Sequence, residues 1–387
     1  MEADQQHRQS LGHVVVIGGN GFLGHHIVNQ ALTRWKTQSV TSIDVQTTRN
    51  RQPQASYREC DITDQRRLTE LLREIRPDVV MHTASPVASG EQGSSSRLLF
   101  RRVNVDGTRC VVEACKDSEV KALVYTSSAS VVSDNRSSDL FNVDESRPTV
   151  RGKRQHEYYS ETKAAAEELV LAANRNNAAP PFLLTTSLRP AGIFGEGDVQ
   201  LLPGLLRAYR DGKTNVQIGD NNNIFDFTYV GNVAHAHLLA SHALLLTSSS
   251  STTTTTTTTT IQPLHHEKVD GEVFFITNDS PCYFWDFARA VWREAGHDRG
   301  TDGVWVLPRG VGVFIGVVAE AFCRLLGLPP FLTRQRAVIS TLTRYYNISK
   351  AKSVLRYEPL WSLGEGISRS LAWFREQDKS ILEKTAA

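Results

Sequence analysis

The feature that most constrains this chain is a run of glycines between a buried strand and a helix. Residues 14–17 (VVVI) are apolar, residues 18–24 (GGNGFLG) follow directly, and apolar residues then recur at helical spacing as far as Leu32. Gly18 permits a tight turn, Gly21 lets the backbone approach a pyrophosphate, and Gly24 lets the helix pack closely on the strand. Free N–H groups at the helix N-terminus favour such phosphates. This stretch therefore predicts a dinucleotide site.

An acidic residue stands where such a site needs one. A second strand at residues 40–43 ends in Asp44, which lies 20 residues after Gly24. A carboxylate at this point suits the two ribose hydroxyls of NAD and repels the additional phosphate of NADP. We therefore expect NAD rather than NADP as the cofactor.

Strands and helices alternate through the first half of the chain. Further strands are expected at residues 57–60, 79–82, 122–125 and 183–188, and helices at about 65–75, 104–116 and 159–173. Asn104 is a suitable N-cap for the second of these helices. This alternation predicts an α/β protein with a Rossmann-type, doubly wound parallel sheet. Ligands of such sheets bind at the carboxyl ends of the strands, where Ala84, Ser85 and Ser128 are expected.

The sequence divides into a core and a later region. We expect a polar tail over residues 1–12, a dinucleotide-binding core over 13–190, and a smaller substrate-binding region over 191–380 that is interleaved with core elements. Residues 247–260 are all serine or threonine and have no apolar surface to bury, which predicts a disordered surface insertion.

Residues 304–328 are apolar but carry Arg309, Glu320 and Arg324. The uncharged part, 310–319, is much shorter than the ~20 residues of a membrane-spanning helix. Three readings stay open: a helix lying in the membrane surface, a lid over an apolar pocket, and ordinary core packing. The first two can coexist, because a lipid-like substrate would enter from the membrane.

The charge and cysteine patterns exclude several classes. The chain has 43 basic and 41 acidic residues, so nothing predicts a nucleic-acid surface. Its first 13 residues contain no apolar run, which predicts no signal peptide and a protein on the cytosolic side. The five cysteines lack metal-binding spacing and are expected to be reduced thiols. His235 and His237 do not share a helical face, and no metal site is expected.

A tyrosine and a lysine provide candidate chemistry. Tyr159 and Lys163 lie one turn apart on the same helical face. A phenol has a pKa of about 10 in water. This pKa must be lowered before the phenol can take a proton from an alcohol near neutral pH. A lysine cation and an oxidised nicotinamide would lower it by stabilising the phenolate. We predict Tyr159 as the base, Lys163 as its electrostatic partner, and Ser128 as the group that orients the substrate oxygen.

Several stretches together carry a family resemblance. They are GGNGFLG at 18–24, YTSSASVV at 125–132, YYSETKAAAE at 158–167, LRPAGIFGEGD at 188–198, FDFTYVGNVAHAHLLA at 225–240, and RYYNISKAKSVLRYEPLWSLGEGI at 344–367. On these motifs the chain resembles the extended short-chain dehydrogenases, and within them the 3β-hydroxysteroid dehydrogenase family and its fungal sterol-4α-carboxylate-oxidising branch. The resemblance covers about residues 13–378, except the serine/threonine tract.

The resemblance implies roles for individual residues. Tyr159 and Lys163 would be catalytic, with Ser128 as the third member and Ser127 as its rival. The cofactor would be lined by Gly18, Gly21, Phe22, Leu23, Gly24, Asp44, Asp61, Ile62, Ala84, Ser85, Tyr159, Lys163, Pro190 and Ile193. Many members have Thr-Gly where this chain has Gly18-Gly19, a departure that leaves the turn intact.

The resemblance also implies an activity. The 3β-hydroxyl of a sterol 4α-carboxylate would be oxidised by NAD to a ketone with loss of carbon dioxide, as in ergosterol-type biosynthesis. It implies a homodimer packed through helices 104–116 and 159–173, peripheral or monotopic contact with the cytosolic face of the endoplasmic reticulum membrane, and other sterol-demethylation enzymes as partners.

Other functions remain open at this point. The first alternative is a 3β-hydroxysteroid, triterpenoid or meroterpenoid dehydrogenase of a specialised fungal pathway, without decarboxylation and with a cytoplasmic location as one option. A nucleotide-sugar epimerase is disfavoured by the apolar stretch 304–328. A binding protein that holds NAD without catalysis commonly lacks the tyrosine and lysine present here.

Overall fold

A parallel seven-stranded sheet forms the centre of the computed structural model, which describes residues 9–87, 94–176, 182–252, 267–326 and 332–377. The strand order is β12-β7-β5-β4-β1-β2-β3, and each neighbouring pair is parallel. The strands are β1 (Ser10–Ile17), β2 (Lys36–Asp44), β3 (Ser56–Glu59), β4 (Val79–His82), β5 (Ala122–Thr126), β7 (Leu184–Pro190) and β12 (Val273–Ile276). The order reverses between β1 and β4, which is where a doubly wound sheet opens a ligand crevice. The predicted fold class is confirmed.

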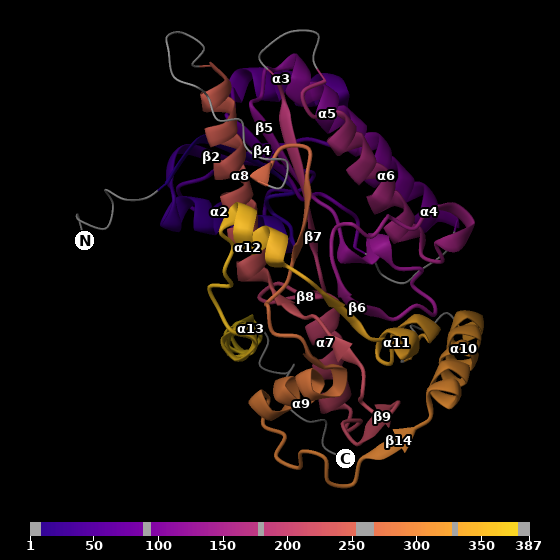
Figure 1. Ribbon diagram of the computed structural model, residues 1–387. Helices are drawn as coiled ribbons and strands as arrows, with labels where there is room; N and C mark the ends of the chain where they lie inside the picture. The colour runs from indigo at the N-terminus through magenta and orange to yellow at the C-terminus, as the bar shows by residue number, and fades with distance from the viewer. Residues whose placement is uncertain (1–8, 88–93, 177–181, 253–266, 327–331, 378–387) are drawn as a thin grey trace.

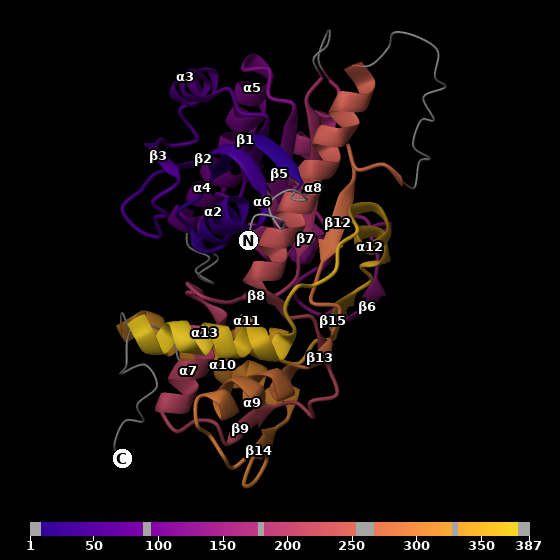
Figure 2. The ribbon, with the colours of Figure 1, turned by 90° about the vertical axis from the view of Figure 1, so that its left-hand side faces the viewer.

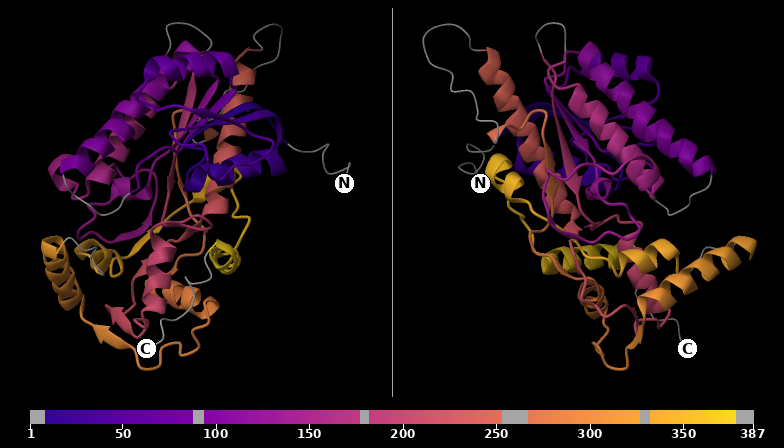
Figure 3. Two further views of the ribbon diagram at one scale, coloured as in Figure 1. Left: turned by 180° about the vertical axis from the view of Figure 1, so that it is seen from behind. Right: turned by 45° about the vertical axis from the view of Figure 1, so that its right-hand side comes forward.

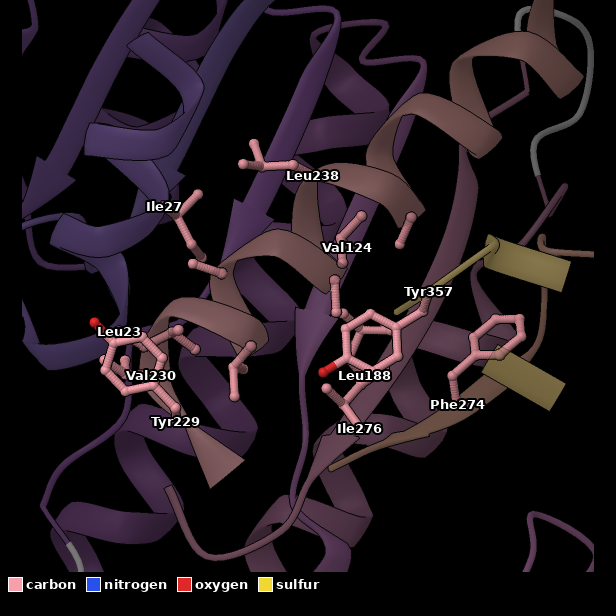
Figure 4. Close-up of a cluster of buried hydrophobic side chains, with 14 of the residues drawn as sticks. Leu23, Ile27, Val124, Leu188, Tyr229, Val230, Leu238, Phe274, Ile276 and Tyr357 are labelled. Carbon is pink, nitrogen blue, oxygen red and sulfur yellow. The ribbon is translucent and has the colours of Figure 1, made fainter. Parts of the chain in front are cut away.

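Helices bury both faces of this sheet (Figure 1). Val14 and Val16 of β1 pack toward α2 (Phe22–Arg34) and α8 (Val230–Thr252), whereas Val15 and Ile17 pack toward the opposite layer. That layer contains α3 (Gln65–Ile75), α5 (Thr108–Asp117) and α6 (Tyr158–Ala172). Alternate side chains therefore enter two separate cores, which explains why the strands are continuously apolar. Figure 4 shows the α2–α8 side, where Ile27, Leu238 and the strand residue Val124 belong to one buried hydrophobic cluster.

The helix expected at 104–116 begins earlier than predicted. Helix α4 (Ser94–Phe100) runs through a π-helical segment, Arg101–Gly107, into α5. Asn104 lies within the π-helical segment and is buried, so its predicted role as an N-cap is wrong. Its side-chain amide instead donates to the Thr162 hydroxyl over 3.0 Å. A buried amide with a partner on another helix has a tertiary role that local capping rules do not reveal.

Later segments build a second region below the sheet (Figure 2). One small sheet has the order β13-β10-β15-β6, and two further strand pairs are β11-β8 and β14-β9. Their bounds are β6 (Leu140–Val143), β8 (Ile193–Phe194), β9 (Val216–Ile218), β10 (Ile224–Phe225), β11 (Thr228–Tyr229), β13 (Cys282–Tyr283), β14 (Trp305–Leu307) and β15 (Arg344–Tyr346). The helices of this region are α7 (Leu201–Arg210), α9 (Phe284–Glu294), α10 (Arg309–Leu326), α11 (Arg334–Ile339) and α13 (Leu363–Gln377).

The two regions exchange segments along the chain. Strand β6 lies within residues 13–190 but pairs in the small sheet, whereas α8, β12 and α12 (Ser349–Leu355) come from later residues and pack on the central sheet. Two short 3-10 helices, Ala129–Val132 and Gly152–Arg154, lie between β5 and α6. The chain therefore crosses between the regions several times.

Two predicted boundaries are wrong. Strand β1 begins at Ser10 and buries Leu11, so the last residues of the predicted tail 1–12 belong to the sheet. Helix α8 continues to Thr252, which removes residues 247–252 from the predicted disordered tract 247–260. The hydroxyls of Thr247 and Ser249 donate to the carbonyls of Ala243 and Leu245 one turn earlier, and such bonds accommodate short polar side chains in a helix. The remainder of the tract lies outside the described residues.

Helix α10 has its large apolar residues on the outside. Phe314 is 67 % and Phe322 is 62 % exposed, and the helix lies at the edge of the second region (Figure 3). Its inner face carries small residues: a Cβ at Gly316 would lie 2.8 Å from the backbone nitrogen of Arg334 in α11. Ordinary core packing therefore fails to explain the apolar stretch 304–328. None of the helices within the described ranges is both long and apolar enough to span a bilayer.

Candidate active site

One cleft of about 2080 Å³ joins the carboxyl ends of the central strands to the second region. It extends from the glycine turn, past α6, to the aromatic residues of β10 and α9. All the residues predicted for the cofactor and for catalysis line it: Gly18, Gly21, Phe22, Leu23, Gly24, Asp44, Asp61, Ile62, Ala84, Ser85, Ser128, Tyr159, Lys163, Pro190 and Ile193. Segments far apart in sequence thus meet in a single cavity.

The glycine turn is closely packed. Gly18 has a φ of +82°, which favours glycine, and its N–H donates to the carbonyl of Ile43 over 2.8 Å. A Cβ at Gly18 would lie 2.7 Å from the backbone nitrogen of Ala84, and a Cβ at Gly24 only 2.0 Å from the carbonyl oxygen of Gly18. Side chains at these positions would therefore displace backbone. The turn leaves a cradle at the N-terminus of α2 that fits a pyrophosphate.

A buried asparagine joins this turn to the end of β2. Asp44 Oδ2 accepts from the backbone N–H of Asn20 over 3.1 Å. The Asn20 side chain is fully buried, accepts from the Ser42 hydroxyl and donates to the carbonyl of Arg49. Asn20 therefore fixes the acidic residue relative to the glycines. Sequence reasoning treated it only as part of the motif.

Asp61 and Ile62 occupy the adjacent edge of the cleft. Asp61 is exposed, and its partial desolvation alone would raise its pKa, but hydrogen bonds from Thr63 and the nearby Arg102 guanidinium hold that pKa below its usual range. The Arg102–Asp61 distance is 2.8 Å. Ile62 is buried beside Gly107, where a Cβ would lie 2.6 Å from the isoleucine Cδ1. Together with the pyrophosphate cradle and Asp44, these residues fit a dinucleotide.

Tyr159 and Lys163 face the cleft from the first turns of α6. Lys163 is buried, its Nζ donates to the carbonyl of Thr126 over 2.7 Å, and it lies 4.9 Å from the centroid of the Tyr125 ring. Burial lowers the pKa of Lys163 to about 7, although Glu167 opposes this shift.

The pKa of the Tyr159 phenol is raised, whereas a base that acts near neutral pH needs a lowered pKa. Burial raises its pKa, and the charge of Glu157 adds to the effect. Its ring packs edge-on against Phe100 with centroids 5.8 Å apart. The chain by itself therefore does not make this phenol acidic. A positive charge in the cleft, such as that of an oxidised nicotinamide, would lower this pKa by stabilising the phenolate.

Hydroxyl groups link the end of β5 to α6. The hydroxyls of Ser128 and Ser130 are 2.8 Å apart, and the Ser160 hydroxyl bonds Ser130 over 2.7 Å and Glu157 over 2.8 Å. Ser127 also lines the cleft, and within the described chain its buried hydroxyl has no hydrogen-bond partner. Both candidate serines therefore reach the cavity, and Ser128 belongs to a polar network that local sequence patterns did not predict.

Aromatic side chains line the other end of the cleft. Phe225, Phe227 and Phe284 form one part of the wall, and Trp285 and Trp292 of α9 form another. Phe225 and Phe227 lie with ring centroids 4.8 Å apart, and Phe284 is 5.6 Å from each. This end is suited to a large apolar ligand. Hydrophobic periodicity assigned these residues to strands and helices without indicating that they share a cavity.

All five cysteines, residues 60, 110, 115, 282 and 323, are free thiols. Across the described ranges, no group of three or more histidine, cysteine, aspartate or glutamate residues could hold a metal ion.

The chain matches known proteins along most of its length. Residues 15–309 match the model of the 3-beta hydroxysteroid dehydrogenase/isomerase family. The chain is 41% identical over 369 residues to a sterol-4-alpha-carboxylate 3-dehydrogenase (decarboxylating) of Schizosaccharomyces pombe, covering 94% of this chain and 98% of that protein. The protein of the same name in Saccharomyces cerevisiae is 39% identical with the same coverage, and the human one is 34% identical over 93% of this chain and 87% of that protein.

Solved structures share the fold. A UDP-glucose 4-epimerase of Thermus thermophilus in complex with NAD superimposes with a TM-score of 0.64 at 21% identity, covering 94% of this chain and 98% of that chain. A dTDP-glucose 4,6-dehydratase of Streptomyces venezuelae with NAD bound gives 0.67 at 19% identity, covering 95% and 99%. At these identities the likeness shows the architecture alone.

Proposed function

The chain belongs to the 3-beta hydroxysteroid dehydrogenase/isomerase family, and we propose that it oxidises the 3β-hydroxyl of a sterol 4α-carboxylate to a ketone with NAD and releases carbon dioxide. Relatives named for this reaction are 39–41% identical over nearly their whole length, which favours it over the dehydrogenase without decarboxylation. The observation that carries the proposal is a single cleft in which Tyr159, Lys163 and Ser128 lie between a dinucleotide cradle and an aromatic wall.

NAD, when bound, accepts the hydride from the alcohol carbon. The glycine turn would hold the pyrophosphate through backbone N–H groups, and Asp44 would receive the ribose hydroxyls. Ser128 hydrogen-bonds the substrate oxygen, and Tyr159 takes the hydroxyl proton as the C–H bond breaks. Lys163 contributes positive charge next to the phenolate.

The second half of the reaction follows from the first. Once the alcohol is a ketone, the bond to the neighbouring carboxylate can break, because the ketone accepts the electron pair as an enolate while carbon dioxide leaves. Ser128 and the protonated Tyr159 can donate hydrogen bonds to the enolate oxygen, where negative charge develops. A carbonyl at this position removes the need for a metal ion.

The test is to incubate purified protein with NAD and a 4-carboxysterol while NADH and carbon dioxide are measured together. We expect both products in equal amounts. NADH without carbon dioxide would favour the dehydrogenase of a specialised pathway, and the absence of both products would reject both functions.

We also propose that α10 lies on a membrane surface as a peripheral contact. Its outer face exposes Phe314, Val318 and Phe322, while Glu320 and Cys323 of the same helix line the cleft. A sterol could therefore pass from the bilayer to the cleft beside this helix. Attachment to the endoplasmic reticulum stays a prediction.

The homodimer also remains a proposal. Helices α5 and α6 pack side by side, and the neighbouring α4 exposes Leu98 to 70 %. We propose that this face joins two copies, as the family resemblance implies. Analytical ultracentrifugation of the purified protein should give twice the mass of the chain, and a monomer at micromolar concentration would exclude it.

A further inference from the structure

A buried ion pair lies one helical turn beyond Lys163 and takes no part in the chemistry described above. The side chains of Arg189 in β7 and Glu167 in α6 are only 5 % and 3 % exposed. Arg189 donates from Nη2 to Glu167 Oε1 over 2.6 Å and from Nε to Oε2 over 2.9 Å. Moving two charges out of water is costly, and their attraction often does no more than offset that cost. Stability alone is therefore a weak explanation for this pair.

The fold brings the ion pair next to the catalytic lysine. Residues four apart lie on the same face of a helix, so Glu167 lies on the face that carries Lys163. The Ser187 hydroxyl of β7 donates to Glu167 Oε2 over 3.2 Å, and Ser187 pairs with Tyr125 of the adjacent strand β5. The last residue of β5 is Thr126, whose carbonyl accepts from Lys163. The lysine and the ion pair thus lie between α6 and two neighbouring strands.

Lys163 needs a nearby negative charge to remain a cation. Its residue is 2 % exposed, its Nζ donates to a neutral carbonyl, and it lies over the neutral Tyr125 ring. Burial lowers the pKa of Lys163 to about 7, and Glu167 is the group whose charge raises that pKa. Without this carboxylate the amine would be largely uncharged at neutral pH, and an uncharged amine does not stabilise a phenolate.

The other titratable side chains that face Lys163 supply no negative charge at neutral pH. They come from α6, β5, β4 and α8 and are Tyr159, Tyr125, His82 and His237. Burial raises the pKa of both phenols. Burial also lowers the pKa of His82 to about 3 and that of His237 to about 4, so both imidazoles are neutral. Among these groups and Glu167, only Glu167 is an anion.

Arg189 fixes the position of this carboxylate. Two parallel N–H groups bind its two oxygens, and the guanidinium lies over the Phe275 ring of β12, with 5.4 Å between Cζ and the ring centroid. Buried charges are stable when they are paired and hydrogen-bonded. A carboxylate held in this way cannot turn toward Lys163 and draw the amine away from Thr126. The pair therefore supplies negative charge while the lysine stays at the cleft.

We propose that Glu167 and Arg189 are positioning residues for the reaction: Glu167 keeps Lys163 positively charged beside the Tyr159 phenol, and Arg189 holds Glu167 in place. This inference rests on the part that the proposed function gives to Lys163. The ion pair lies behind the wall of the cleft and acts through the lysine. It sets the pH range in which the enzyme works.

Trace acetylation with acetic anhydride tests the charge of Lys163 directly, because only an uncharged amine reacts. Lys163 lines the cleft, through which this small reagent reaches it. Mass spectrometry of the purified protein gives the pH of half-maximal reactivity, with the exposed Lys153 as internal standard. For Glu167→Gln we expect this midpoint to fall by about one pH unit. Glu167→Asp retains the charge and should recover most of that fall.

Glu168→Gln is the matched control. Glu168 is the next residue, is exposed and pairs with Arg151, so its loss should leave the midpoint unchanged. Thermal melting shows whether Glu167→Gln folds, because it leaves Arg189 buried without its partner. The double change Glu167→Leu with Arg189→Met decides the question if it does not, since apolar side chains of similar size often replace a buried pair without loss of stability. A fall of about one pH unit is expected there too. An unchanged midpoint in either folded variant would overturn the proposal.

Turnover provides a second readout that a purely structural role would not reproduce. In Glu167→Gln the alkaline limb of the pH profile should move to lower pH, so turnover should fall about tenfold more on the alkaline side than on the acidic side. An equal loss at every pH would indicate disturbed packing and would overturn the proposal. If the unchanged protein oxidises no carboxysterol, the proposed function fails, whereas acetylation of Lys163 needs no substrate and still decides this inference.

Discussion

The two ends of the cleft differ in what lines them. The dinucleotide end consists largely of backbone, in which a Cβ at Gly24 would lie 2.0 Å from the carbonyl of Gly18. The other end consists of side chains from short strands and helices, with Phe225 and Trp285 among them. A site formed by backbone keeps the same shape when side chains change. A site formed by side chains can accept a different ligand after a few substitutions. This difference explains how one fold accommodates both nucleotide-sugar enzymes and a family named for hydroxysteroids.

The two ends also differ in how they affect the pKa of a carboxyl group. Asp61, an exposed residue at the dinucleotide end, has a pKa held below its usual range by hydrogen bonds and Arg102. Asp226, behind the aromatic end, has its pKa raised to about 7 by burial. The surroundings of Asp61 therefore favour its charged form, whereas those of Asp226 favour its neutral form.

The largest expected effect comes from Tyr159→Phe, which removes one oxygen where the two ends meet. Turnover should fall by about a thousandfold, because the general base is lost. NAD affinity should stay within about threefold, because the backbone cradle is unchanged. NADH formation and NAD titration measure the two quantities.

Tyr158→Phe is the matched control for this prediction. Tyr158 is the residue before Tyr159, but its ring packs under the guanidinium of Arg97, with 4.4 Å between the Arg97 Cζ and the ring centroid. Its loss should leave turnover nearly unchanged. Substantial turnover in the Tyr159 variant would remove that residue from its proposed role.

Gly24→Ala tests whether the dinucleotide end is as inflexible as its distances indicate. The new methyl group would meet the carbonyl of Gly18, so the free energy of unfolding should fall by about 3 kcal/mol and NAD binding should weaken with it. Gly364→Ala in α13 is the control, because no atom lies within 4 Å of its added Cβ. That change should raise the free energy of unfolding by about 0.5 kcal/mol. Urea denaturation with and without NAD distinguishes the two, and equal stabilities would contradict the close packing of the turn.

Asp226→Asn tests the contrast in charge. The carboxyl accepts from the Tyr346 N–H over 2.8 Å, and its pKa is about 7 in the folded chain against 3.8 ordinarily. Between about pH 4 and 7 the unfolded chain binds fewer protons than the folded chain, so the free energy of unfolding falls as the pH rises. An amide retains the hydrogen-bond acceptor without the charge. The variant should gain about 2 kcal/mol over the unchanged protein at pH 7 and little at pH 4. A gain that does not depend on pH would refute this account.

The same contrast explains what the sequence could predict. The glycine turn, Asp44 and the Tyr159–Lys163 pair each lie within one local pattern, and the parallel sheet follows from alternating apolar segments. The cavity confirms that these segments converge, although their roles remain predictions. Local rules predict Asn104 as a cap, and they fail there because its hydrogen-bond partner Thr162 is distant in sequence.

The substrate end gave almost no local signal. Phe225 stands in the two-residue strand β10 and Trp285 in α9, and no periodicity connects these segments, although both residues line the cleft. The apolar stretch 304–328 allows three interpretations, because a sequence shows that residues are apolar but not which face they occupy. Packing of Gly316 against α11 turns the large side chains outward, and that contact is tertiary.

The smallest expected effect concerns the exposed face of α10. The prediction tests whether this face, like the substrate end of the cleft, contacts apolar molecules. Replacing both Phe314 and Phe322 by serine should lower the partition coefficient onto phosphatidylcholine vesicles by about tenfold, because two exposed rings no longer enter the bilayer surface. The free energy of unfolding should change by less than about 0.5 kcal/mol, since both side chains are already exposed.

Phe141→Ser is the control for this last prediction, because Phe141 of β6 is 64 % exposed at a distant point in the sequence. Vesicle co-sedimentation of the control should equal that of the unchanged protein. If both variants lose the same share of binding, general surface hydrophobicity is responsible and α10 has no special place. If only the α10 variant loses binding, and its turnover with vesicle-borne sterol falls while turnover with detergent-dispersed sterol does not, the helix delivers the apolar ligand to the side-chain end of the cleft. The dinucleotide end binds a water-soluble nucleotide in either case. NAD affinity should therefore be the same in the unchanged protein, the α10 variant and the Phe141 variant.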